Sequence, residues 1–126
     1  MKDLNLEKDK IYSIYVKVSY KDIYDDNFNS IFTGTVNCTK DITLTDESLA
    51  NLLRSYPWYN CNFKTVNFTD VTDLVNEINI LREEMSKFDW NNKEYTDFEK
   101  LADIELELNN KINPRYFGAF DIEKTI

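Results

Sequence analysis

Two charged side chains interrupt the apolar stripes of the second half of the chain, and they are its best candidates for specific chemistry. Steps of 100° per residue put Arg82 on the apolar face of one predicted helix and Glu105 on that of the next. In an antiparallel hairpin centred near Asn92 these positions lie almost opposite, so we expect Arg82 and Glu105 to meet. The contact has two interpretations: an ion pair that fixes the register of two helices, or an arginine that holds an anion while Glu105 orients it.

The two interpretations lead to different expectations. If the pair is buried and fixes the register, Arg82→Met alone should destabilise the fold by about 3–5 kcal/mol, because Glu105 would keep its charge without a partner. If the pair belongs to a ligand site, the chain sequesters a phosphorylated or nucleotide-like molecule, a small anionic ligand. Arg82 and Glu105 would then act together with Arg115, Tyr56 and Trp90.

Aromatic side chains gather in the predicted connections between elements. Tyr56, Trp58 and Tyr59 lie close together around Pro57, and Trp90 falls between the two long helices. Tyrosine and tryptophan on loops are typical of recognition surfaces, because they offer a large and rigid contact area. The same residues would equally well close the ends of a small core, so this pattern does not distinguish a protein partner from a small ligand.

Carboxylates cover the predicted outer faces of both long helices. They interrupt neither apolar stripe, and lysines only partly neutralise them; they are Asp73, Glu77, Glu83 and Glu84 on the first helix and Glu99, Asp103 and Glu107 on the second. A charged helix face is often simply solvated. The alternative is a partner with a basic groove, in which carboxylates on a rigid helix imitate spaced phosphates.

Several kinds of active site are excluded by composition. The chain has no histidine, and its two cysteines, Cys38 and Cys61, are far apart, so neither a histidine-dependent nucleophile nor a four-ligand zinc site is available. We expect both cysteines to be small core residues. The only glycines are Gly34 and Gly118, so there is no glycine-rich phosphate loop. We therefore expect a non-enzyme with no cofactor, no metal and no catalytic residues.

The 126 residues predict a single domain with an uneven charge distribution. Residues 1–69 carry nine acids and eight bases, whereas residues 70–126 carry fourteen acids and seven bases. A net charge of −8 argues against direct nucleic-acid binding. No apolar run is long enough to span a membrane, and the first ten residues resemble no signal peptide, so we expect a soluble, cytoplasmic protein.

The first part of the domain, residues 1–69, is predicted to be rich in strands. Apolar residues alternate with polar ones from Tyr12 to Tyr20 and, more weakly, from Ile31 to Cys38, which predicts an antiparallel hairpin. A third strand is expected from Cys61 to Phe68. Its alternation changes phase near Lys64 or Thr65, which indicates a β-bulge at that point.

Between and after the strands, 3.6-residue periodicity predicts helices. Thr45 is placed to cap a short helix that ends before Pro57. A first long helix is expected to begin at Thr69 or Asp70 and to end near Phe88.

A second long helix is expected behind a capping box of Thr96 and Glu99, with Pro114 ending it. The short polar link between the long helices favours an antiparallel hairpin. The tail from Tyr116 to Ile122 would add a fourth strand or pack as coil. The fold class is thus α+β: a small antiparallel sheet of three or four strands, one short helix, and a C-terminal antiparallel two-helix hairpin packed on the sheet.

No motif of a known family is present. The composition, with fifteen asparagines, more lysine than arginine and an excess of acid, resembles that of small acidic accessory proteins of phages and mobile elements in AT-rich bacteria, anti-CRISPR and anti-restriction inhibitors among them. This resemblance implies a stoichiometric inhibitor of a host nucleic-acid-handling defence complex. The residues that we expect to contact such a partner are Glu83, Glu84, Glu99, Asp103, Glu107, Trp58 and Tyr59. The sequence leaves open whether the chain forms a homodimer.

Overall fold

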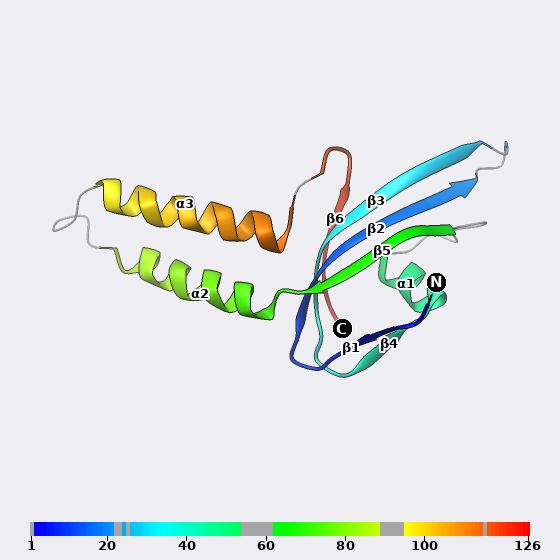
Figure 1. The fold of residues 1–126 in the computed structure, drawn as a ribbon, viewed down its shortest axis with the longest axis horizontal. Coiled ribbons are helices and arrows are strands. Elements are labelled where there is room, and N and C mark those ends of the chain that lie inside the picture. The colour runs from blue at the N-terminus through cyan, green and yellow to red at the C-terminus, as the bar shows by residue number, and fades with distance from the viewer. Residues whose placement is uncertain (1, 22–23, 25, 54–61, 89–94, 115) are drawn as a thin grey trace.

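The structure is a computed structural model that describes residues 2–21, 24, 26–53, 62–88, 95–114 and 116–126. Six strands and three helices lie within these residues, as Figure 1 shows. In chain order they are β1 (Leu4–Leu6), β2 (Ile11–Lys21), β3 (Asn27–Asn37), β4 (Ile42–Leu44), α1 (Asp46–Leu53), β5 (Asn62–Asp70), α2 (Thr72–Ser86), α3 (Tyr95–Ile112) and β6 (Phe120–Thr125).

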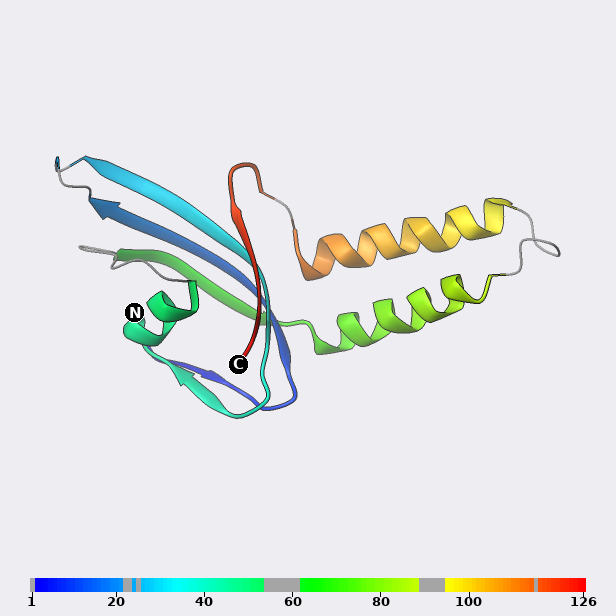
Figure 2. The same ribbon diagram turned by 180° about the vertical axis from the view of Figure 1, so that it is seen from behind.

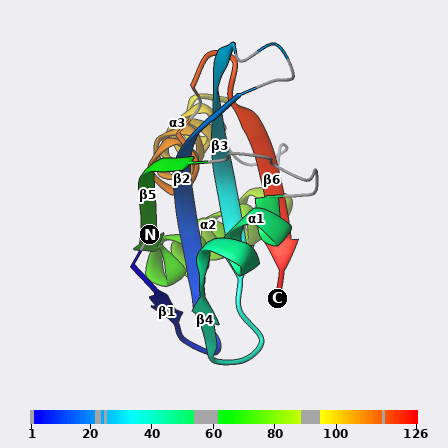
Figure 3. The same cartoon turned by 90° about the vertical axis from the view of Figure 1, so that its right-hand side faces the viewer.

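The main sheet has four strands in the order β5-β2-β3-β6 (Figure 3). The predicted antiparallel hairpin is confirmed as β2 and β3, which pair from Ile11 with Asn37 at one end to Lys21 with Asn27 at the other. The predicted third strand is β5, which pairs antiparallel with β2.

The predicted bulge in the third strand is confirmed at Lys64. Lys17 of β2 pairs with Thr65, whereas the next residue, Val18, pairs with Phe63. Lys64 is therefore the extra residue, and it keeps the apolar residues on both sides of it directed toward the same core.

The fourth strand of the sheet differs from the expectation of an antiparallel arrangement. β6 pairs parallel with β3, so the sheet is mixed. After α3 the chain reverses in a turn where the amide of Ala119 donates to the carbonyl of Tyr116 at 3.2 Å. Gly118 lies in this turn with a φ of 74°, in the left-handed region that favours glycine. This reversal is what sets β6 parallel to β3.

The larger core lies on one face of the main sheet, under a layer that the sequence did not predict in full. β1 and β4 form a second, two-stranded antiparallel sheet, and α1 follows it. The predicted cap of α1 is confirmed, because the Thr45 hydroxyl accepts a hydrogen bond from the Ser48 amide at 3.2 Å. The buried residues of this core are Leu6, Tyr12, Ile14, Val16, Val18, Phe32, Val36, Cys38, Leu44, Leu49, Leu52 and Leu53.

The first long helix begins later than predicted. β5 continues to Asp70, which pairs with Tyr12, and α2 begins only at Thr72. The amide and hydroxyl of Thr72 both donate to Asp70 Oδ1, at 3.0 and 2.6 Å. These hydrogen bonds, the one from the hydroxyl foremost, lower the pKa of the Asp70 carboxyl below its usual value. The helix was expected to start at Thr69 or Asp70, but both residues belong to β5 and pair with β2.

The second long helix begins earlier than predicted. α3 starts at Tyr95, so Thr96 lies inside the helix rather than at its cap, and the predicted capping box is wrong. The helix ends at Ile112, just before Pro114, as expected.

The two long helices do not cover the sheet. Figures 1 and 2 show α2 and α3 side by side and projecting away from it. We call these two helices the arm. The expectation of a C-terminal hairpin packed on the sheet is therefore wrong in two respects, since only the base of the arm meets the sheet and β6 follows it. A separate apolar cluster joins the arm helices to each other and to Ile11 of β2, with Val71, Ile78, Leu81, Leu108 and Ile112 buried.

Candidate functional site

The arm carries exposed carboxylates along both of its helices. Those of α2 and α3 predicted to lie outside the apolar stripes are all exposed in the structure, and so is Asp97; they are Asp73, Glu77, Glu83, Glu84, Asp97, Glu99, Asp103 and Glu107. Because the arm stands clear of the sheet, these groups are displayed on a projecting rod rather than on a compact surface (Figure 2).

Lysines neutralise only part of this surface. Lys87 Nζ lies 2.9 Å from Glu83 Oε1, and Lys111 Nζ lies 3.5 Å from Glu107 Oε1, each one helical turn apart. Within the described part of the chain, Glu84, Glu99 and Asp103 have no lysine or arginine at ion-pair distance. The arm therefore keeps a net negative potential that a basic surface could meet.

The predicted meeting of Arg82 and Glu105 is confirmed, but the pair is not buried. Arg82 Nε lies 3.9 Å from Glu105 Oε2, and the two side chains are 51% and 32% exposed. Exposed ion pairs contribute about 0–1 kcal/mol. The loss of about 3–5 kcal/mol from Arg82→Met was expected for a buried pair, and the structure does not meet that condition, because Glu105 stays in contact with water when its partner is removed.

A double-mutant cycle with Arg82→Met and Glu105→Leu is expected to give a coupling free energy below about 1 kcal/mol, since water screens both side chains. Urea unfolding of the four proteins measures it. The exposed pair Lys111 and Glu107 is a matched control that should give a coupling of similar size. A coupling of about 2 kcal/mol or more for the first pair alone would contradict the exposed geometry.

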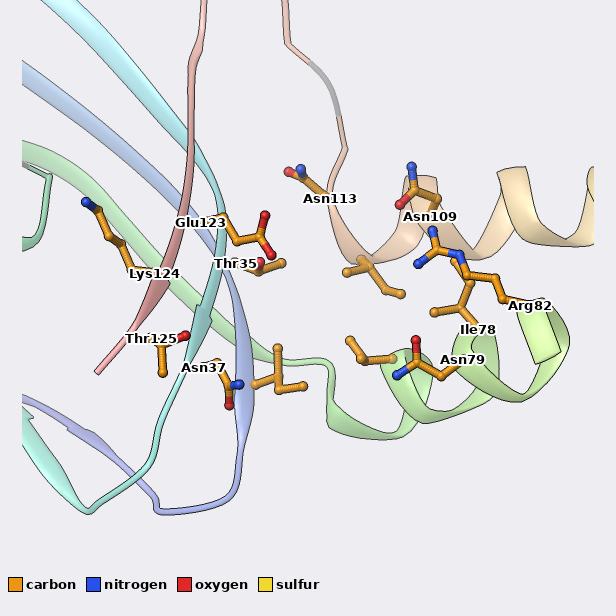
Figure 4. A pocket seen from close by; sticks show the side chains of 13 residues that line it. Thr35, Asn37, Ile78, Asn79, Arg82, Asn109, Asn113, Glu123, Lys124 and Thr125 are labelled. Atoms are coloured by element: carbon orange, nitrogen blue, oxygen red, sulfur yellow. The ribbon is translucent and has the colours of Figure 1, made fainter. Parts of the chain in front are cut away.

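A cleft of about 390 Å³ lies where the base of the arm meets the sheet (Figure 4). Thr35, Asn37, Glu123 and Thr125 face it from β3 and β6. From the arm it is lined by aliphatic residues and by polar ones: Val75, Ile78, Asn79, Arg82, Asn109, Ile112 and Asn113. Arg82 is thus the one residue that contributes both to the ion pair and to the cleft, among the residues described.

Four asparagines that the sequence pattern did not bring together line this cleft: Asn37, Asn79, Asn109 and Asn113. Asn79 lies three residues before Arg82, so the two share one face of α2. Asn113 directly follows the end of α3, and its amide donates to the carbonyl of Asn109 at 2.8 Å. The spacing of three residues in the first pair and of four in the second was the feature of the sequence from which these neighbours could have been identified. Asn113 Nδ2 donates to Asp121 Oδ1 at 3.2 Å, whereas the buried Asn113 Oδ1 accepts no hydrogen bond from any described residue. Such an acceptor typically costs about 1–3 kcal/mol, which a suitable donor would recover.

Five residues of the predicted sites fall outside the described residues. They are Tyr56, Trp58, Tyr59, Trp90 and Arg115. Farther along the chain, the ring of Tyr116 contacts that of Tyr15 edge to face at 5.1 Å, and Phe117 is fully exposed.

The described residues contain no group of three or more histidine, cysteine, aspartate or glutamate residues that could hold a metal ion. Cys38 is buried as predicted, and burial raises the pKa of its thiol, which disfavours the nucleophilic thiolate. Cys61 lies outside the described residues. None of the helices in the described ranges is long and apolar enough to cross a bilayer.

The site thus consists of an acidic arm and of an asparagine-rich cleft at its base, joined by Arg82. In comparisons with known proteins, no protein-family model, no curated protein and no solved structure matches this chain.

Proposed function

We propose that this chain is a non-enzymatic interaction protein whose acidic arm docks in a basic groove of a partner protein. The observation that supports the proposal is the arm itself, which projects from the sheet and carries exposed carboxylates. Three of them, Glu84, Glu99 and Asp103, have no lysine or arginine partner among the residues that the structure describes. A rigid two-helix rod can enter a groove that a flat acidic surface could not.

The partner that fits this chemistry is a host nucleic-acid-handling complex. A groove that binds the phosphate backbone is lined with lysine and arginine, and spaced carboxylates compete for those cations. The protein would then act as a stoichiometric inhibitor, as anti-CRISPR and anti-restriction inhibitors do. It would compete with DNA or RNA for the partner and would not bind nucleic acid itself, in keeping with its net charge of −8.

Charge reversal on the arm is expected to slow association with the partner by about tenfold or more, because steering of charged surfaces is lost. The variant carries Glu84→Lys, Glu99→Lys and Asp103→Lys. The control carries Asp3→Lys, Glu7→Lys and Glu47→Lys, which lie on exposed positions away from the arm. Each change adds two positive charges, so both variants have a net charge of −2 instead of −8.

The measurement starts with capture of partners from a bacterial lysate by the unmodified protein and continues with association rates for each purified partner. Binding should weaken steeply with salt, since exposed charges are screened over about 8 Å at physiological ionic strength. The purified partner should release bound DNA or RNA when the protein is added. Equal rates for the arm variant and the control, or no competition with nucleic acid, would contradict the proposal.

A further inference from the structure

We propose that the cleft between the arm and the sheet binds a nucleoside monophosphate, with adenine as the base. The cleft of about 390 Å³ is near the lower end of the range of about 300–1,000 Å³ that small-molecule pockets occupy. That size suits one mononucleotide rather than a dinucleotide. The proposal does not depend on the docking of the arm, because the outer carboxylates of the arm do not line the cleft.

The inner wall of the cleft is aliphatic. Ile11 of β2, Val75 and Ile78 of α2, and Ile112 of α3 all line it. Ile78 and Ile112 are nearly fully buried, so the partly buried Ile11 and Val75 offer most of the apolar surface. A planar ring packs its faces on such side chains while its edge stays free for hydrogen bonds. Pockets that combine an apolar wall with a few converging polar groups are typical small-molecule sites.

The polar groups around this wall are carboxamides and hydroxyls. Each asparagine offers a donor and an acceptor side by side, a pair that matches the adjacent amino group and ring nitrogen of adenine. Asn79 and Asn109 supply such pairs from the two arm helices. Across the cleft, Figure 4 shows Thr35 and Glu123 directed from the sheet toward the arm, where they can bond the hydroxyls of a ribose.

Arg82 would bind the phosphate. Its side chain is half exposed, and among the described residues its guanidinium has an ion-pair contact only with Glu105, at a long 3.9 Å, so a phosphate can replace that contact with two shorter, charge-assisted hydrogen bonds. The other basic residue that lines the cleft, Lys124, points to the opposite side of β6 (Figure 4). One guanidinium in an acidic chain suits a monophosphate better than a triphosphate.

Isothermal titration calorimetry of the full chain with AMP, adenosine, GMP, ATP and ribose 5-phosphate tests the proposal. AMP at up to about 1 mM should give saturable heat. Adenosine, GMP and ATP should each bind about tenfold more weakly, and ribose 5-phosphate more weakly still, since it lacks the base. No saturable heat with AMP, or equal affinity for AMP and ribose 5-phosphate, would overturn the proposal.

Two variants of the ion pair separate phosphate binding from a structural role. Arg82→Gln should lower the AMP affinity about tenfold, to that of adenosine, and leave adenosine binding unchanged. Glu105→Gln breaks the same ion pair but keeps the guanidinium, so it should keep or raise the AMP affinity. If Glu105→Gln weakened AMP as much as Arg82→Gln does, or if neither change had an effect, the assignment of Arg82 to the phosphate would be wrong.

A third variant tests the contact to the base. Asn109→Ala should weaken AMP and adenosine by the same factor, about tenfold, and leave ribose 5-phosphate unaffected. Thermal unfolding of each variant without nucleotide shows that the fold is intact. An intact Asn109→Ala protein that binds AMP as the unmodified chain does would overturn the part of the proposal that concerns adenine.

Discussion

Replacing Gly34 with alanine is expected to destabilise the fold by at least about 3 kcal/mol and to release β6 from the sheet. A Cβ atom at this position would fall on the backbone carbonyl oxygen of Ile122 and within 2.8 and 2.9 Å of the carbonyl carbon and amide nitrogen of the same residue. The φ angle of Gly34 is 139°, which an alanine adopts only with strain. Because Gly34 of β3 pairs with Ile122 of β6, this steric clash would directly disrupt the pairing of the two strands.

Gly118→Ala is the matched control for this change. Gly118 also has a positive φ, of 74°, but nothing lies within 4 Å of the added Cβ. It should therefore cost only the backbone strain, about 1 kcal/mol. Urea unfolding measures both losses, and amide hydrogen exchange shows whether β6 loses protection before β2 and β3. Similar losses for the two variants would show that close approach of β6 is not what requires glycine at position 34.

The sheet could be predicted from the sequence because half-buried strands alternate strictly. Ile14, Val16 and Val18 face the core, and the same alternation gave the β2–β3 hairpin and the bulge at Lys64. β1 and β4 were missed because a strand of three residues is too short to show a period. The parallel pairing of β6 with β3 was missed because partner choice depends on the path of the whole chain rather than on the local pattern.

The position of the helices was predicted wrongly although the relevant pattern was present. The alternation of β2 directs Ser13, Lys17 and Ser19 away from the core, on the same face as Ile11 and Tyr15. That face of β2 therefore has no continuous apolar row on which a helix could pack along its length. The apolar face is instead covered by α1 with β1 and β4. The helices α2 and α3 bury their apolar faces against each other, and the two helices therefore project from the sheet.

The candidate site was predictable where helix geometry alone sets distances. Residues at fixed spacing on two antiparallel helices must lie opposite each other, so the contact of Arg82 with Glu105 followed from counting. The exposure of this pair could not be predicted, because nothing in the sequence tells whether a third element covers the pair. The cleft was not predictable for a related reason. It combines Asn79 and Asn109 with Thr35 of β3, and their proximity depends on how the arm meets the sheet.

Leu108→Ala is expected to unfold the arm while the sheet remains folded. Leu108 is 5% exposed in the cluster at the base of the arm, and this kind of truncation costs about 2–5 kcal/mol. That cluster is separate from the core under β2 and β3, so the loss falls on α2 and α3. The amides of both helices should lose protection from hydrogen exchange, whereas those of β2 and β3 should keep theirs.

The sheet can survive this change because of how the arm is inserted into the chain. An unfolded arm is a long loop between β5 and β6, and the entropy cost of closing a loop grows only slowly with its length. The control is Leu106→Ala on the same helix, where the side chain is 61% exposed and truncation should cost less than about 0.5 kcal/mol. If Leu108→Ala instead lowered protection equally in the arm and in the sheet, the two clusters would unfold as one unit. The arm would then be an inseparable part of the core rather than an appendage that the sheet carries.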